Sequence, residues 1–81
     1  MTTSVVIPSF NGRQHLDRNL PAVMALGADE VVIVDDASTD GTPQYPGVRF
    51  IRHLRNLRFP ITVNDGFAAA SGDIVFLLNQ D

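Results

Sequence analysis

The amino-acid sequence predicts an α/β fold with a mostly parallel sheet of about four strands and helices on its faces. Three short runs rich in apolar and β-branched residues, at 4–7, 31–34 and 74–78, have the length of strands. Strands without alternating polar residues are typical of a sheet covered on both faces, as in parallel α/β folds. Segments with helical spacing separate these runs. At 81 residues, the chain is at most one small domain.

The first strand is predicted at residues 4–7, and we expect it to end at Pro8, which cannot donate a backbone hydrogen bond. A helix follows over residues 13–26, because apolar residues recur there at helical spacing and Gly27 is a natural terminator. Pro21 lies inside this segment, so we expect a kink or a late helix start at that residue.

The second strand is predicted at residues 31–34, and a polar loop with little or no helix follows it over residues 35–47. Residues 48–58 fit two structures, since their apolar residues and their arginines recur at a spacing that a helix would also allow. We favour a strand that ends near Arg52, because it follows a glycine turn and keeps the α/β alternation.

A second helix is predicted over residues 60–71, since proline is common in a first turn and Gly72 would end the helix. Gly66 weakens this helix, because glycine disfavours helical backbone. The third apolar run, residues 74–78, is expected to be a strongly buried strand. Three polar residues, 79–81, follow that strand at its carboxyl end.

The composition of the chain excludes some classes of binding partner and cellular location. The formal net charge of −3 and the isoelectric point near 5.0 give no basic field, so we expect no nucleic-acid partner. The absence of cysteine fits a reducing compartment. The longest apolar run is too short for a transmembrane segment, and the N-terminus lacks the basic region of a signal peptide. We therefore expect a soluble, cytoplasmic protein.

Three polar segments are expected to meet at one edge of the sheet, because ligands of such folds bind outside the carboxyl ends of the strands. They are residues 8–11, the pair Asp35 and Asp36, and residues 79–81. Carboxylates gathered there suit Mg²⁺ or Mn²⁺, and they can also bind ribose hydroxyls or a base N–H. Equally, Asp35 and Asp36 would simply cap the strand and solvate the loop. The sequence contains no glycine-rich dinucleotide or P-loop motif.

Several segments carry a resemblance to a known family. They are VVIPSFNG (5–12), VVIVDDASTDGT (31–42), RNLRF (55–59), NDG (64–66) and ASGDIVFLLNQD (70–81). In order and spacing they resemble the opening of the family 2 glycosyltransferases with the GT-A fold, over essentially the whole chain. The resemblance implies a Rossmann-like half of that fold. It also implies that the whole chain is the N-terminal, nucleotide-sugar-binding portion of a truncated glycosyltransferase domain.

The resemblance implies a role for each residue at the sheet edge. Residues 8–11 would form one wall of a nucleoside pocket, with Phe10 packed on the base. Asp36 would contact the base or the ribose, and Asp35 would support the loop. Asp81 would bind the Mg²⁺ or Mn²⁺ that bridges the diphosphate. The implied nucleotide-binding residues are Pro8, Ser9, Phe10, Asn11, Asp35, Asp36 and Asn79, and the implied metal ligand is Asp81.

Two residues depart from the family pattern. Asn79 replaces the first aspartate of the Asp-x-Asp motif, as in members similar to rhamnosyltransferases, and a neutral amide would bind ribose or metal more weakly. Arg58 stands where the family usually has glycine, and would be a phosphate ligand or, as we favour, a solvated surface charge. His15 and His53 have no partner visible in the sequence, and we expect both to be structural.

The implied reaction is transfer of a glycosyl group from a nucleotide-diphosphate sugar to an unknown acceptor hydroxyl, with inversion at the anomeric carbon. A general base of this family would lie beyond Asp81, so we expect residues 1–81 alone to be inactive. An uncovered sheet edge would favour self-association. The alternative is a non-catalytic nucleotide- or metal-binding module of flavodoxin-like topology, which the strand order would distinguish.

Overall fold

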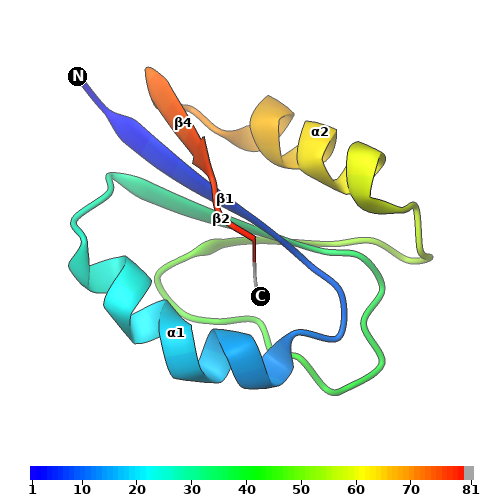
Figure 1. Ribbon diagram of the computed structural model, residues 1–81. Helices are drawn as coiled ribbons and strands as arrows, with labels where there is room; N and C mark the ends of the chain where they lie inside the picture. The colour runs from blue at the N-terminus through cyan, green and yellow to red at the C-terminus, as the bar shows by residue number, and fades with distance from the viewer. Residues whose placement is uncertain (80–81) are drawn as a thin grey trace.

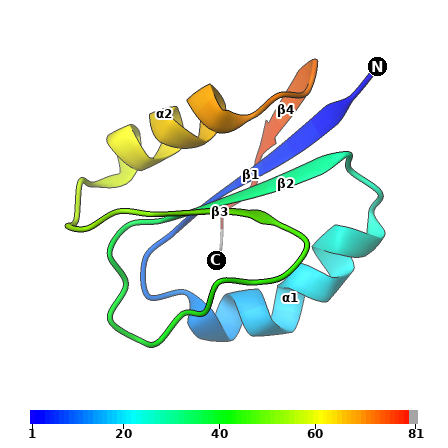
Figure 2. The same ribbon diagram turned by 180° about the vertical axis from the view of Figure 1, so that it is seen from behind.

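The computed structural model describes residues 1–79 and contains a four-stranded sheet in which all neighbouring strands are parallel. Helix α1 covers one face of the sheet and helix α2 the other (Figure 1), and the view from behind shows the same two layers (Figure 2). The elements are β1 (Thr3–Ser9), α1 (Arg13–Ala25), β2 (Glu30–Asp35), β3 (Arg49–Arg52), α2 (Phe59–Ala69) and β4 (Ile74–Leu77). The predicted α/β class and parallel sheet are confirmed.

The strand order is β3-β2-β1-β4, which decides between the two topologies considered from the sequence. A flavodoxin-like sheet would place β3 beside β1, whereas a Rossmann-like sheet places it beside β2. The order is Rossmann-like, so the flavodoxin-like alternative is wrong in its topology. The strand interpretation of residues 49–52 is confirmed, and residues 36–48 contain no helix, as predicted.

The core consists of two apolar layers, one on each face of the sheet. Side chains alternate between faces along β1 and β2, and both faces are covered, so consecutive residues of these strands are buried. The layer on the α1 face contains Val5, Ile7, Leu16, Leu20, Val23, Val31 and Ile33. The layer on the α2 face contains Val6, Val32 and Val34. This accounts for the unbroken apolar runs that predicted a buried sheet.

Pro8 lies inside β1, so the expected end of the strand at this residue is wrong. The carbonyl groups of Thr2 and Val6 face β4 and accept hydrogen bonds from the N–H groups of Ile74 and of Leu78, the residue after β4. Backbone groups alternate in direction along a strand, so Pro8 faces the same side. The described pairing of β1 with β4 ends at Val6 and Leu77. The N–H group that proline lacks would therefore fall where no neighbouring strand is paired.

Helix α1 begins at Arg13 and continues through Pro21, so a late start at the proline is wrong. The N-cap residue Gly12 offers no side-chain cap. A carboxylate from the loop after β2 fills this role, because the Arg13 N–H donates to Asp40 Oδ2 at 2.9 Å. The helix ends at Ala25, and Gly27 follows with a left-handed φ of 83°, as expected of a terminator.

Helix α2 lies unusually close to the sheet at Gly66. A Cβ atom on this glycine would stand 2.3 Å from Val6 Cγ1 and 3.3 Å from Val34 Cγ2. The sequence suggested only that Gly66 weakens the helix. The structure shows its benefit, which is that the backbone of α2 can pack directly on the valines of the central strands.

Strand β4 is exposed, so the expected strong burial of residues 74–78 is wrong. All of these apolar residues remain between 36% and 55% exposed, because β4 is an edge strand and no described element lies over it. A hollow of about 530 Å³ separates Leu78 from the α1 side chains Leu16 and Leu20. The sequence correctly predicted a strand here, but residues 1–79 leave its apolar side chains partly exposed.

Candidate functional site

A pocket of about 290 Å³ opens at the carboxyl ends of β1, β2 and β4, at the edge of the sheet predicted from the sequence. The register that pairs Ser9 with Asp35 ends both central strands at the same level. The residues that follow them, Phe10 and Asp36, therefore flank one opening. The pocket is lined by Pro8, Ser9, Phe10, Asp36, Asn56, Arg58, Phe59, Thr62 and Asn79.

Five of the eight predicted site residues line this pocket, namely Pro8, Ser9, Phe10, Asp36 and Asn79. Asn11 and Asp35 are not among its lining residues. Asp81, the predicted metal ligand, lies outside the described residues. The other wall comes from the start of α2 and the loop before it, and no feature of the sequence assigned Asn56, Phe59 or Thr62 to the site.

Asp36 is a buried carboxylate that fastens this second wall to the end of β2. Its side chain is 6% exposed. Oδ1 accepts hydrogen bonds from the Leu57 N–H at 2.7 Å and from His53 Nδ1 at 2.8 Å, and Oδ2 accepts one from the Arg58 N–H at 2.9 Å. Burial alone would raise the pKa of Asp36, but these hydrogen bonds outweigh it and lower the pKa below its ordinary value.

His53 bridges two carboxylates, neither of which could be identified as its partner from the sequence. Its Nδ1 lies 2.8 Å from Asp36 Oδ1 and its Nε2 lies 2.7 Å from Asp65 Oδ2. Ionised carboxylates only accept hydrogen bonds, so His53 can donate to both of them only when both ring nitrogens carry a proton. Burial disfavours this charge, but the hydrogen bonds to Asp36 and Asp65 prevail and raise the pKa of His53. The expected structural role agrees with this bridge. No sequence signal marked partners 17 and 12 residues away.

The raised pKa of His53 predicts that stability falls as the pH increases above about 6.5. A group whose pKa is higher in the folded state stabilises the fold fully below its unfolded pKa, and this contribution is lost as the pH rises through the folded pKa. Each unit by which folding raises the pKa contributes about 1.4 kcal/mol to the free energy of unfolding. We expect urea unfolding to show a lower free energy at pH 9 than at pH 6.

The His53→Gln variant is expected to lose most of this dependence, since glutamine has no charge to titrate. His15→Gln is the matched control, because His15 is an exposed histidine of α1 that contacts neither carboxylate. The control should keep the pH dependence of the unmodified chain. An equal slope in the His53→Gln variant would contradict the assignment of the imidazolium.

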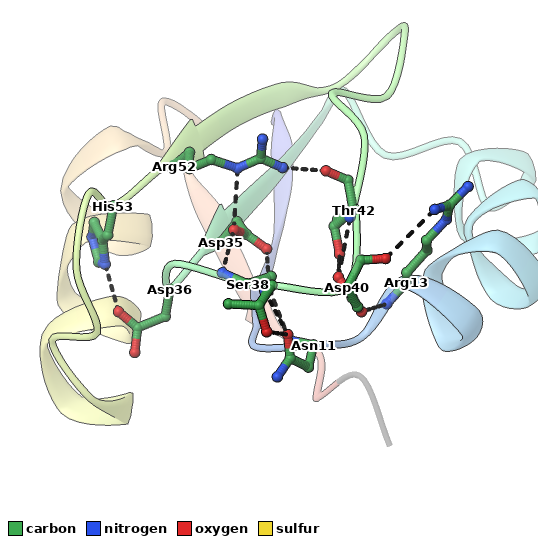
Figure 3. A network of polar contacts seen from close by, with 10 residues as sticks. Asn11, Arg13, Asp35, Asp36, Ser38, Asp40, Thr42, Arg52 and His53 are labelled. Carbon is green, nitrogen blue, oxygen red and sulfur yellow. Dashed lines mark hydrogen bonds and ion pairs between the residues drawn. The ribbon is translucent and has the colours of Figure 1, made fainter.

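A second polar network lies on the other side of the β2 end and fixes the loop after it (Figure 3). Asp35 is fully buried and accepts hydrogen bonds from the N–H and hydroxyl groups of Ser38 and from Arg52 Nε. Asn11 joins this loop to the turn after β1, since it donates its N–H to Ser38 Oγ and accepts the Thr39 N–H at its Oδ1. In the structure, Asp35 and Asn11 therefore position the loops that flank the pocket.

The pocket wall also contains a hydroxyl group that makes no hydrogen bond within the described part of the chain. Ser9 is 2% exposed, and its Oγ is buried without a partner among residues 1–79. A buried polar group in this state carries a desolvation penalty that a bound ligand would remove. Phe10 follows Ser9 in the chain and lines the same pocket, and the residue is 46% exposed.

The described residues do not form a metal site by themselves. No three His, Asp or Glu side chains within residues 1–79 are grouped so that they could hold an ion. Asp36 lines the pocket, but its carboxylate is already bound to His53 and two backbone N–H groups. Asn79 offers a neutral amide oxygen, which is a hard but weak ligand.

Among residues 1–79, no helix is long and apolar enough to cross a bilayer, and the longest, α1, has 13 residues.

Comparisons with known proteins agree on one family. The model of the family described as "Glycosyl transferase family 2" matches residues 4–81. The chain is 33% identical to a dolichol-phosphate mannosyltransferase of Pyrococcus furiosus and 34% identical to an uncharacterized glycosyltransferase of Nostoc sp.. These alignments include all of this chain but only 26% and 28% of those proteins.

A solved structure is similar in fold as well as in sequence. It is glucosyl-3-phosphoglycerate synthase from Mycobacterium tuberculosis in complex with Mn²⁺, UDP and phosphoglyceric acid, and the TM-score is 0.83 at 26% identity. The similarity covers 99% of this chain and 33% of that one. The chain thus spans a quarter to a third of the length of the proteins that it matches.

Proposed function

The chain belongs to glycosyl transferase family 2, and we propose that its pocket binds the nucleotide diphosphate of an activated sugar. The observation that carries this proposal is the pairing of Phe10 and Asp36 on one pocket wall, each directly after a central strand. A half-exposed aromatic ring can stack on a base, and a rigidly held carboxylate can accept a hydrogen bond from a base or ribose. Oδ2 of Asp36, with one hydrogen bond from the Arg58 N–H, keeps lone pairs for this purpose.

The reaction that we propose is transfer of the sugar to an acceptor hydroxyl with inversion at the anomeric carbon. Asp81, assisted by Asn79, would hold Mg²⁺ or Mn²⁺, and the ion would neutralise negative charge on the departing diphosphate. The similar mycobacterial structure contains Mn²⁺ and UDP, which supports the choice of donor and cation. The amide of Asn79 is the reason to include rhamnosyl donors among the candidates.

We propose that this chain supplies only one part of the complete active site. Residues 1–81 would supply the donor-binding portion, while the resemblance to the family implies a general base beyond Asp81. We therefore propose that the chain alone does not catalyse transfer. Its lack of cysteine fits the cytoplasm, where we place it. The exposed apolar strand β4 supports self-association of the isolated chain.

Titration of UDP, dTDP and GDP, each with and without Mn²⁺, tests the proposed function. We expect one of them to shift the NMR signals of Phe10, Asp36 and Asp81, with a larger response when Mn²⁺ is present. Phe10→Ala should weaken the binding of that nucleotide by roughly tenfold, because base stacking contributes about 1–3 kcal/mol.

Phe67→Ala is the matched control for this substitution. Phe67 lies on α2 outside the pocket, and its 44% exposure is close to the 46% of Phe10. Its loss should leave nucleotide affinity within about twofold, since no base contact is removed. No shift with any of the three nucleotides, or shifts confined to other parts of the chain, would contradict the proposed function.

A further inference from the structure

Arg58 has a backbone conformation that favours glycine. Its φ of 77° and ψ of 165° fall in a region that side chains with a Cβ atom rarely adopt, because of steric crowding. Glycine would adopt the same conformation without strain. An arginine at this position therefore has a conformational cost.

Contacts of the backbone, which any residue could make, hold this conformation in place. The N–H of Arg58 donates to Asp36 Oδ2 at 2.9 Å and to Asn56 Oδ1 at 3.2 Å. Its carbonyl oxygen accepts hydrogen bonds from the N–H and the hydroxyl of Thr62, at 3.1 and 2.8 Å. A glycine would keep all four contacts and avoid the strain. The arginine side chain is therefore unnecessary for the fold at this point.

The side chain lines the pocket, where it carries the positive charge. Arg58 is the only cationic residue among the nine described residues that line it. The structure shows no hydrogen bond or ion pair from its guanidinium to residues 1–79. By contrast, the guanidinium groups of Arg13, Arg49 and Arg52 pair with carboxylates. The guanidinium of Arg58 thus remains available for an anion that enters the pocket.

We propose that Arg58 binds the phosphate oxygens of the nucleotide diphosphate and partly replaces the divalent cation in holding it. This inference rests on the proposed function, and it revises the interpretation of Arg58 as a mere surface charge. A guanidinium donates paired hydrogen bonds to phosphate, and its charge is independent of metal. Because the chain has a net charge of −3 and Asn79 is neutral, a fixed positive charge in the pocket would help to hold an anionic ligand. The buried Ser9 hydroxyl lines the same pocket, has no hydrogen-bond partner among residues 1–79, and offers a further polar contact.

The test compares a nucleoside diphosphate with its nucleoside in buffer that contains EDTA. The diphosphate is whichever of UDP, dTDP or GDP binds in the titration above. Arg58→Gly should weaken diphosphate binding about tenfold, the expected loss of one charge-assisted contact, and leave nucleoside binding unchanged. Its melting temperature should be equal to or higher than that of the unmodified chain, since the strain is removed. A loss of affinity would then not reflect unfolding.

Arg55→Ala is the matched control, because it removes the same charge from an exposed residue of the same loop that does not line the pocket. It should change diphosphate affinity by less than about twofold, as expected of a screened surface charge. Unchanged diphosphate binding in Arg58→Gly, or an equal loss for diphosphate and nucleoside, would overturn the role of Arg58 and leave the proposed function standing. Failure of all three diphosphates to bind the unmodified chain would instead overturn the proposed function.

Discussion

Replacement of Asp36 by alanine is expected to lower the free energy of unfolding by about 3–5 kcal/mol, the usual cost of removing one partner of a buried ion pair. The variant would leave His53 without one of its two carboxylate partners. It would also leave the N–H groups of Leu57 and Arg58 without their acceptor. A chain of 81 residues has a total stability of about 4–12 kcal/mol, so this variant should lose a large share of its stability.

The expected loss is large because Asp36 joins parts of the chain that few other contacts hold. It connects the end of β2 to residues 53–58, which form no regular secondary structure and lead into α2. The same residues supply the second wall of the pocket. Loss of the carboxylate should therefore disturb nucleotide binding and stability together, and urea unfolding with far-UV circular dichroism would measure the stability.

Two further variants separate the charge from the hydrogen bonds. Asp36→Asn keeps one acceptor oxygen, and we expect it to cost less than the alanine variant. Asp65→Asn alters the other partner of His53. The side chain of Asp65 is 46% exposed, so this variant should lower the free energy of unfolding by no more than about 1 kcal/mol. Stability of the alanine variant within about 0.5 kcal/mol of the unmodified chain would contradict this account, since that range is typical of neutral surface changes.

Gly66→Ala is expected to destabilise the protein by about 1–3 kcal/mol, although alanine is the better helix former. In an exposed helix the substitution would stabilise by up to about 1 kcal/mol. Here the added methyl group would stand 2.3 Å from Val6 Cγ1, and Val6 is fully buried between sheet and helix. Valine is stiff about its first side-chain torsion, so it cannot turn aside at low cost.

A double-mutant cycle tests this clash directly. Val6→Ala removes the methyl group that Gly66→Ala would meet, so the double variant should be more stable than the sum of the two single effects predicts. Ala68→Gly, at an exposed position of the same helix, is the control and should cost about 1 kcal/mol. An increase in stability in Gly66→Ala would show that α2 lies further from the sheet than the structure places it.

The strands of the sheet could be predicted because each one is marked by a run of apolar residues that are adjacent in the sequence. Strand and helix positions depend on residues a few places apart, and the carboxyl-end rule then placed Asp36 and Phe10 at one edge. The partners of Asp36 could not be found in this way. His53 and the N–H groups of Leu57 and Arg58 are distant in sequence, and two of these three contacts involve backbone that any residue supplies.

The local sequence pattern also could not determine how deeply each strand is buried. The apolar run of β4 resembles that of β2 in composition, yet β2 is enclosed by both helices while β4 is largely exposed. The difference lies in what is packed beside each strand, which an apolar pattern does not encode. Gly66 shows the same limit, because its value lies in a contact with Val6, 60 residues earlier in the chain, and not in helix propensity.

The pairing of β1 with β4 joins the first and last described strands of the chain. During synthesis, β1, α1 and β2 emerge early and can assemble, but the β4 side of β1 must wait for roughly 40 more residues. At about 5–20 residues per second, that delay lasts roughly 2–8 seconds. Throughout this interval the nascent chain presents an open strand edge to its neighbours on the polysome.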